Sequence, residues 1–158
     1  MRNLLLACCL VLLAVSPSLA KDNMSSYWVC ATPTQLQSIR AGDQPGHTYA
    51  ISSGFCKPSG NNTFQEKTVH FSNILDKSGN TVIIQATYVS TTLSGDTINY
   101  AANGSYDVRG GVIQTGMVTW TLTGGTGKFA NVTGEGTCSA VGDMNKTVSF
   151  TCGGAYTL

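Results

Sequence analysis

The sequence predicts one all-β domain that carries two disulfides, and three observations support this. Gly, Ser and Thr make up 51 of the 138 residues after position 20, and these residue types favour turns and strands over helix interiors. Short strand-like segments recur along this stretch, separated by turn-forming residues. Four cysteines remain in it, the even number expected of a disulfide-bonded exported domain.

The first 20 residues are typical of a secretory signal peptide. A positive start at Met1-Arg2 precedes an apolar run over 4–15, and Ser18-Leu19-Ala20 provides small residues before a cleavage point. A membrane span needs roughly 17 or more apolar residues. A lipoprotein signal at Cys8 is disfavoured because the apolar run before it is too short. We therefore expect a signal peptide at 1–20, a single domain at 21–158, and a secreted or periplasmic protein without a membrane span.

The charge balance disfavours several classes of partner. After removal of Arg2, eight Lys and Arg face eight Asp and Glu, so no basic patch for nucleic acid is expected. A phosphate-binding loop is excluded because Leu122 stands where its first glycine should be and Phe129 where its hydroxyl residue should be. No cofactor is predicted.

The four exported cysteines are Cys30, Cys56, Cys138 and Cys152. Three pairings are possible, and we prefer neighbours, because Cys138 and Cys152 flank a turn at 142–145 almost symmetrically. Cys30 then pairs with Cys56. No metal site is predicted, since the chain has no closely spaced Cys or His pairs of the kind that bind zinc.

The elements follow in order. A short strand at 27–31 precedes Thr32-Pro33, where the capping threonine, the proline and a glutamine three residues after the cap predict one short helix near 33–41. Asn103-Gly104 is the strongest hairpin signal. The remaining candidate strands lie at 47–56, 64–75, 81–92, 96–102, 105–109, 113–123, 128–141 and 147–156. Strands at this spacing form a sandwich or a barrel, and periodicity does not choose between them.

A family resemblance lies in residues 119–138, TWTLTGGTGKFANVTGEGTC. Gly124-Gly125-Thr126-Gly127-Lys128-Phe129, followed by Gly134 and Gly136, resembles the signature hairpin of the allene oxide cyclase barrel superfamily, which includes the plant dirigent proteins. The closing segment 136–156 resembles an exported bacterial branch with a cysteine-stapled last hairpin. The resemblance implies an eight-stranded antiparallel barrel with Phe129 in its core, and suggests a homo-oligomer.

Two groups of side chains are candidate site residues. Glu66, Thr68 and His70 alternate onto one face of a strand. If that face looks inward, a carboxylate and an imidazole share the interior as weak catalytic candidates. If Val69 and Phe71 face the core instead, Glu66 and His70 are solvated.

Aromatic residues form the second group, which could present polar groups to a ligand or simply pack the core. Its members are Tyr49, Tyr88, Tyr100, Tyr106 and Trp120, and Thr68 joins them as a candidate ligand-binding residue.

Three functions remain open. The sequence favours a non-catalytic exported barrel that binds a small apolar ligand. The first alternative, implied by the resemblance, is a cavity enzyme of the isomerase or cyclase kind, or a dirigent-like coupling guide. The second is a structural envelope or adhesion module.

Overall fold

The computed structural model describes residues 21–158, and the predicted signal peptide with Cys8 lies outside them. Nine strands and one short 3₁₀ turn make up this part of the chain. They are β1 (Asp22–Cys30), β2 (Gln35–Arg40), β3 (Thr48–Ser59), β4 (Glu66–Ser78), β5 (Thr81–Thr92), β6 (Thr97–Arg109), β7 (Val112–Gly125), η1 (Gly127–Phe129), β8 (Thr133–Gly142) and β9 (Val148–Thr157).

Eight of these strands close into an antiparallel barrel, which confirms the predicted architecture. The strand order is β1-β9-β8-β7-β6-β5-β4-β3, and a second pairing of β3 with β1 closes the ring. This closing ladder is short: it runs from Tyr27 opposite Ser59 to Cys30 opposite Cys56. β2 lies outside the ring, paired with the first half of β3.

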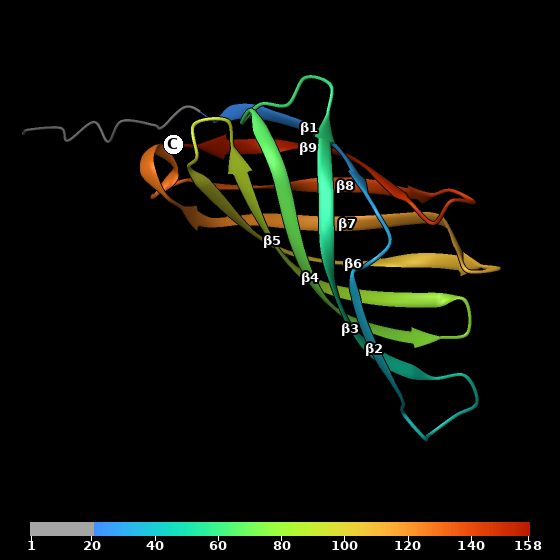
Figure 1. Cartoon of the computed structure of the whole chain (residues 1–158). Helices are drawn as coiled ribbons and strands as arrows, with labels where there is room; N and C mark the ends of the chain where they lie inside the picture. Colours follow the sequence, from blue (N-terminus) through green and yellow to red (C-terminus); the bar gives the residue numbers. More distant parts are fainter. Residues whose placement is uncertain (1–20) are drawn as a thin grey trace, which may run out of the picture.

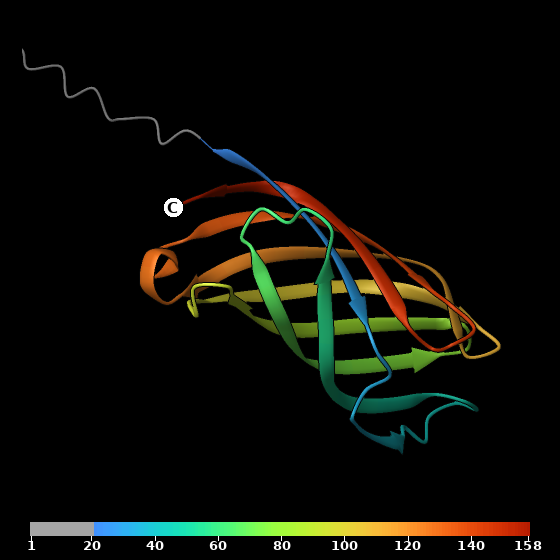
Figure 2. The same cartoon turned by 45° about the horizontal axis from the view of Figure 1, so that its top comes forward.

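The two ends of the barrel differ (Figures 1 and 2). At one end, here called the capped end, lie η1, the C-terminus and the loop between β3 and β4. The Phe129 side chain at the end of η1 is buried and packs edge-on against Phe64. At the other end, the open end, lie the turns that join β4 to β5, β6 to β7 and β8 to β9.

The prediction of a short helix near 33–41 is wrong. Residues 35–40 form β2, and all six of its residues are exposed. The predicted cap, Thr32, caps no helix: its hydroxyl donates to the Lys146 carbonyl. The amide and the hydroxyl of Thr34 both donate to the Ser53 carbonyl, which aligns the following residues with β3. A helix this short gains little by itself in water, so pairing with a free strand edge prevails.

The predicted hairpin at Asn103-Gly104 is also wrong. Both residues lie inside the continuous strand β6, and the turn falls at Gly110-Gly111, which both have positive φ. Gly104 is needed for a different reason: a Cβ atom there would lie 2.2 Å from the Met117 carbonyl oxygen of β7. The glycine therefore marks a close approach of two strands.

Two glycines of residues 119–138 have a visible role. Gly127 has φ of 55°, and a Cβ atom on it would meet the Asp96 carboxylate. In β8, a Cβ atom on Gly136 would lie 2.4 Å from the Trp120 ring. The absence of a side chain at Gly136 therefore leaves room for the Trp120 indole against the β8 backbone. The strand expected from 128 begins only at Thr133, after η1.

Both predicted disulfides are present. Cys30–Cys56 joins β1 to β3 at the last residue pair of the closing ladder. Cys138–Cys152 joins β8 to β9 in the middle of their ladder. The first disulfide therefore holds the barrel closed, whereas the second reinforces a hairpin that is already well paired.

Candidate functional site

A cavity of about 220 Å³ opens at the open end of the barrel. Its walls come from seven strands, which are all but β2 and β8, together with the connection from β1 to β2 and the turn before β9. Most of the lining side chains are apolar, and they include Phe71, Leu75, Val82, Ile113 and Phe150. Lys146, exposed in the turn before β9, is the charged residue of the lining. The arrangement can hold a small apolar molecule.

Two polar side chains interrupt this apolar wall. Ser52 of β3 and Asn73 of β4 line the cavity and are directly opposite one another in the β3–β4 ladder. Ser52 is 1% exposed. The Ser52 Oγ and the Asn73 Oδ1 atoms are both buried without a hydrogen-bond partner. Buried polar atoms are normally paired, so this pair is an exception within the cavity wall.

The predicted aromatic group is divided by the structure. Tyr88 and Tyr106 are buried and line the cavity. Burial raises the pKa of Tyr88 to about 12, an effect partly offset by the Tyr106 hydroxyl beside it. Burial also raises the pKa of Tyr106, and the neighbouring Tyr88 hydroxyl raises it further. Both phenols therefore stay protonated and uncharged at neutral pH.

The other aromatic candidates lie elsewhere. Trp120 and Tyr100 pack edge-on against each other in the closely packed centre of the barrel, between the two ends. Tyr49 is 42% exposed on the outside, beside His47. None of the three lines the cavity.

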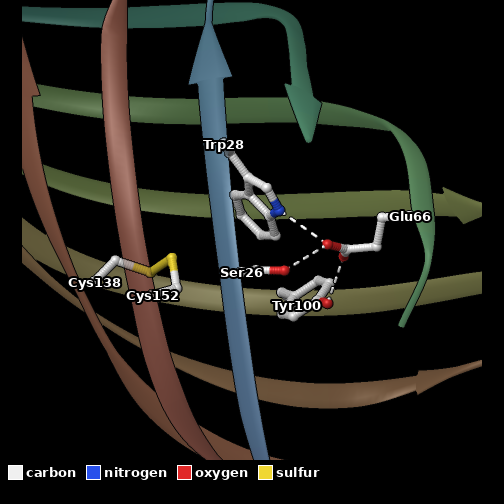
Figure 3. The surroundings of a disulfide bond; sticks show 6 residues. All are labelled: Ser26, Trp28, Glu66, Tyr100, Cys138 and Cys152. Carbon is white, nitrogen blue, oxygen red and sulfur yellow. Dashed lines mark hydrogen bonds between the residues drawn. A yellow bond between two sulfur atoms is a disulfide. The ribbon is translucent and has the colours of Figure 1, made fainter. Parts of the chain in front are cut away.

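Glu66 is buried at the start of β4, inside the barrel and towards the capped end. Figure 3 shows three side chains that point at its carboxylate. The Ser26 hydroxyl and the Trp28 indole N–H both donate to Oε2 at 2.9 Å, and the Tyr100 hydroxyl donates to Oε1 at 2.7 Å. Burial, with the neighbouring Glu66 charge, raises the pKa of Tyr100 well above its usual value, which keeps Tyr100 a donor.

The Glu66 network joins β1, β4 and β6 and is separate from the cavity, because none of its four residues belongs to the cavity lining. Charge-assisted hydrogen bonds of this kind are among the stronger polar contacts in proteins. The carboxylate is thus placed to hold three strands together at the capped end.

Glu66, Thr68 and His70 do not share a face. A β-bulge between Glu66 and Thr68 puts an extra residue into β4, so the alternation shifts by one position. Glu66 points inward, Val69 is buried, and Thr68 and His70 are exposed. The His70 ring lies against Phe55 on the outside. The carboxylate and the imidazole are therefore on opposite sides of the barrel wall.

Sequence reasoning missed Ser52, Asn73 and a histidine cluster. The inward direction of Ser52 could have been inferred from Cys56, four residues later in the same strand and on the same face. In the cluster, His47 Nδ1 lies 2.6 Å from Asp43 and its Nε2 lies 2.8 Å from Asp76. Hydrogen bonds to Asp43 and then Asp76 raise the pKa of His47.

Neither a metal-binding cluster nor a membrane-spanning helix was found in the described part of the chain. No group of three or more His, Cys, Asp or Glu side chains in residues 21–158 could hold a metal ion. Within the same residues, no helix is long and apolar enough to cross a membrane.

No protein-family model matches this chain, and a search of curated proteins finds no significant match. The function is therefore argued from the cavity itself.

Proposed function

We propose that this protein is an exported binding protein that holds a small apolar ligand in the cavity at the open end of its barrel. The observation that carries the proposal is a cavity of about 220 Å³ with largely apolar walls. An apolar cavity of about 150 Å³ accommodates benzene, so this one suits a ligand of roughly nine non-hydrogen atoms. Burial of such a ligand would be driven by removal of its apolar surface from water.

Export is part of the proposal and has independent support. Both disulfides are of the kind that persists in oxidising compartments, in agreement with the signal peptide predicted for residues 1–20. The barrel size is compatible with a binding role, because eight-stranded barrels either fill their interior with side chains or hold one small ligand, and this barrel leaves a cavity.

The proposal assigns no catalytic role to Glu66 or His70. Both lie outside the cavity lining, and the structure holds them apart. A cyclase or isomerase that uses the pair would need both groups beside the same bound molecule.

Native mass spectrometry of the protein purified from its own host, before and after mild organic extraction, tests the proposal. We expect an added mass that extraction removes. The control compares two variants: Val108→Phe, which narrows the cavity, and Val141→Phe, on an exposed strand position. Retention by the second variant and loss by the first would place the ligand in the cavity. Equal retention by both would contradict the proposal. The same spectrum gives the oligomeric state and so tests the predicted homo-oligomer.

A further inference from the structure

We infer that the cavity selects a neutral alcohol, whose hydroxyl binds between Ser52 and Asn73 while its hydrocarbon body fills the apolar walls. The inference rests on the proposed function and adds the chemical class of the ligand and the two residues that recognise it.

The first step is the position of the polar pair. Ser52 and Asn73 are direct cross-strand partners, and opposed residues in antiparallel strands have their Cβ atoms about 4.5–5.5 Å apart. Both line the same cavity. One ligand group can therefore reach the two side chains at once.

The second step is their lack of partners. The Ser52 Oγ and Asn73 Oδ1 atoms are buried and make no hydrogen bond within the described protein. Ser90 Oγ and Trp120 Nε1 are also buried without a partner, but neither residue lines the cavity. Among the polar side chains of the lining, the Tyr88 and Tyr106 hydroxyls lie against each other. Ser52 and Asn73 are thus the groups in the cavity wall that a ligand can satisfy.

The third step is the chemistry of the pair. Asn73 Oδ1 is an acceptor, and the Ser52 hydroxyl both donates and accepts. A ligand hydroxyl can donate to Asn73 and accept from Ser52 at the same time. A ketone only accepts, so it leaves the Asn73 oxygen unpaired, and an unpaired buried acceptor weakens binding.

The fourth step concerns charge. No ionised group lies beside Ser52 and Asn73 in the lining, and Lys146, the lining cation, is exposed in the turn before β9. A charged group carried to the depth of the polar pair would lose its hydration without an opposite charge. This favours a neutral group at that position.

Three probes with the same eight-membered ring test the inference: cyclooctanol, cyclooctanone and cyclooctanecarboxylate. The alcohol and the ketone have nine non-hydrogen atoms, the size estimated for the cavity. Binding to the intact, disulfide-bonded protein is measured by NMR titration. We expect the alcohol to bind about tenfold more tightly than the ketone. Asn73→Leu should abolish that preference, and Ser52→Ala should reduce it. Asn103→Leu, at an exposed position of β6, is the matched control and should retain it.

The other outcomes are also informative. Equal binding of alcohol and ketone, or tighter binding of the ketone, would overturn the inference and leave the proposed function intact. Tightest binding of the carboxylate, lost in Lys146→Gln, would overturn it in favour of an anion held at the mouth. If none of the three probes binds, both the inference and the proposed binding function fail at this ligand size. If a folded Asn73→Leu variant still prefers the alcohol to the ketone, Asn73 is not the residue that recognises the ligand hydroxyl.

Discussion

Removal of the Cys30–Cys56 disulfide should open the barrel between β1 and β3, whereas removal of Cys138–Cys152 should not. The bonds have sequence separations of 26 and 14 residues, and the entropy of loop closure depends only on the logarithm of loop length. The chain-entropy model then gives losses of about 3.5 and about 3 kcal/mol in the free energy of unfolding. Global stability alone will therefore hardly distinguish the two variants.

The difference lies in the folded state. The β1–β3 ladder has four residue pairs, one of which contains Pro58 without an amide hydrogen, whereas the β8–β9 ladder has ten pairs. At about 1 kcal/mol net for each backbone hydrogen bond, the hydrogen bonds of this ladder contribute no more than about 4 kcal/mol. A local opening that costs a free energy of this size lies at or below the free energy of unfolding of a typical domain, so it can occur while the rest of the domain stays folded.

Amide hydrogen exchange of Cys30→Ala/Cys56→Ala and of the control Cys138→Ala/Cys152→Ala measures this difference. We expect the amides of 27–30, Cys56, Lys57 and Ser59 that bond across the β1–β3 ladder to exchange by local opening in the first variant and to keep their protection in the control. Because Cys30 lines the cavity, the first variant should also bind cyclooctanol more weakly. Equal protection of these amides in the two variants would refute the assignment of Cys30–Cys56 as the bond that keeps the barrel closed.

Three further predictions concern the barrel interior and the histidine cluster. Gly136→Ala should lower the free energy of unfolding in urea by roughly 1–3 kcal/mol, because its Cβ atom would collide with Trp120. Gly153→Ala is the control and should be nearly neutral, because the nearest atom to its Cβ would be 4.0 Å away; equal effects would contradict the explanation given for Gly136. Glu66→Gln should cost about 1–3 kcal/mol of stability without changing cyclooctanol affinity, and a loss of binding at unchanged stability would instead place Glu66 in the site. The contacts of His47 should stabilise the β2–β3 loop fully at pH values below the usual imidazole pKa, and this stabilisation should be lost as the pH rises through the raised pKa of His47. NMR titration of His47 should give a lower midpoint in Asp43→Asn than in the unmodified protein. An unchanged midpoint would exclude the Asp43 contact as the cause of the raised pKa.

The strands were largely predictable because their signal is local. Alternation and turn residues locate β5 and β9 closely, and the even cysteine count with the symmetric turn at 142–145 gives the disulfides. The errors have a common cause, which is long-range pairing. Residues 32–35 carry helix-start signals, yet residues 35–40 pair with a free edge of β3.

The candidate site was harder to predict, for two physical reasons. A single bulge after Glu66 reverses the direction of every later side chain in β4, so simple alternation groups Glu66 with His70 when only one of them is inside. Ser52 and Asn73 meet through the register of two strands, and no local motif in either strand marks that meeting.

The central claim is that the interior cavity, and not the outer wall of the barrel, is the ligand site. Nuclear Overhauser contacts between bound cyclooctanol and the protein test it most directly. We predict contacts to the methyl groups of Val82, Leu75 and Ile113, which line the cavity. Contacts confined to Ile51 and Ile74, which are exposed on the outside of β3 and β4, would contradict the account.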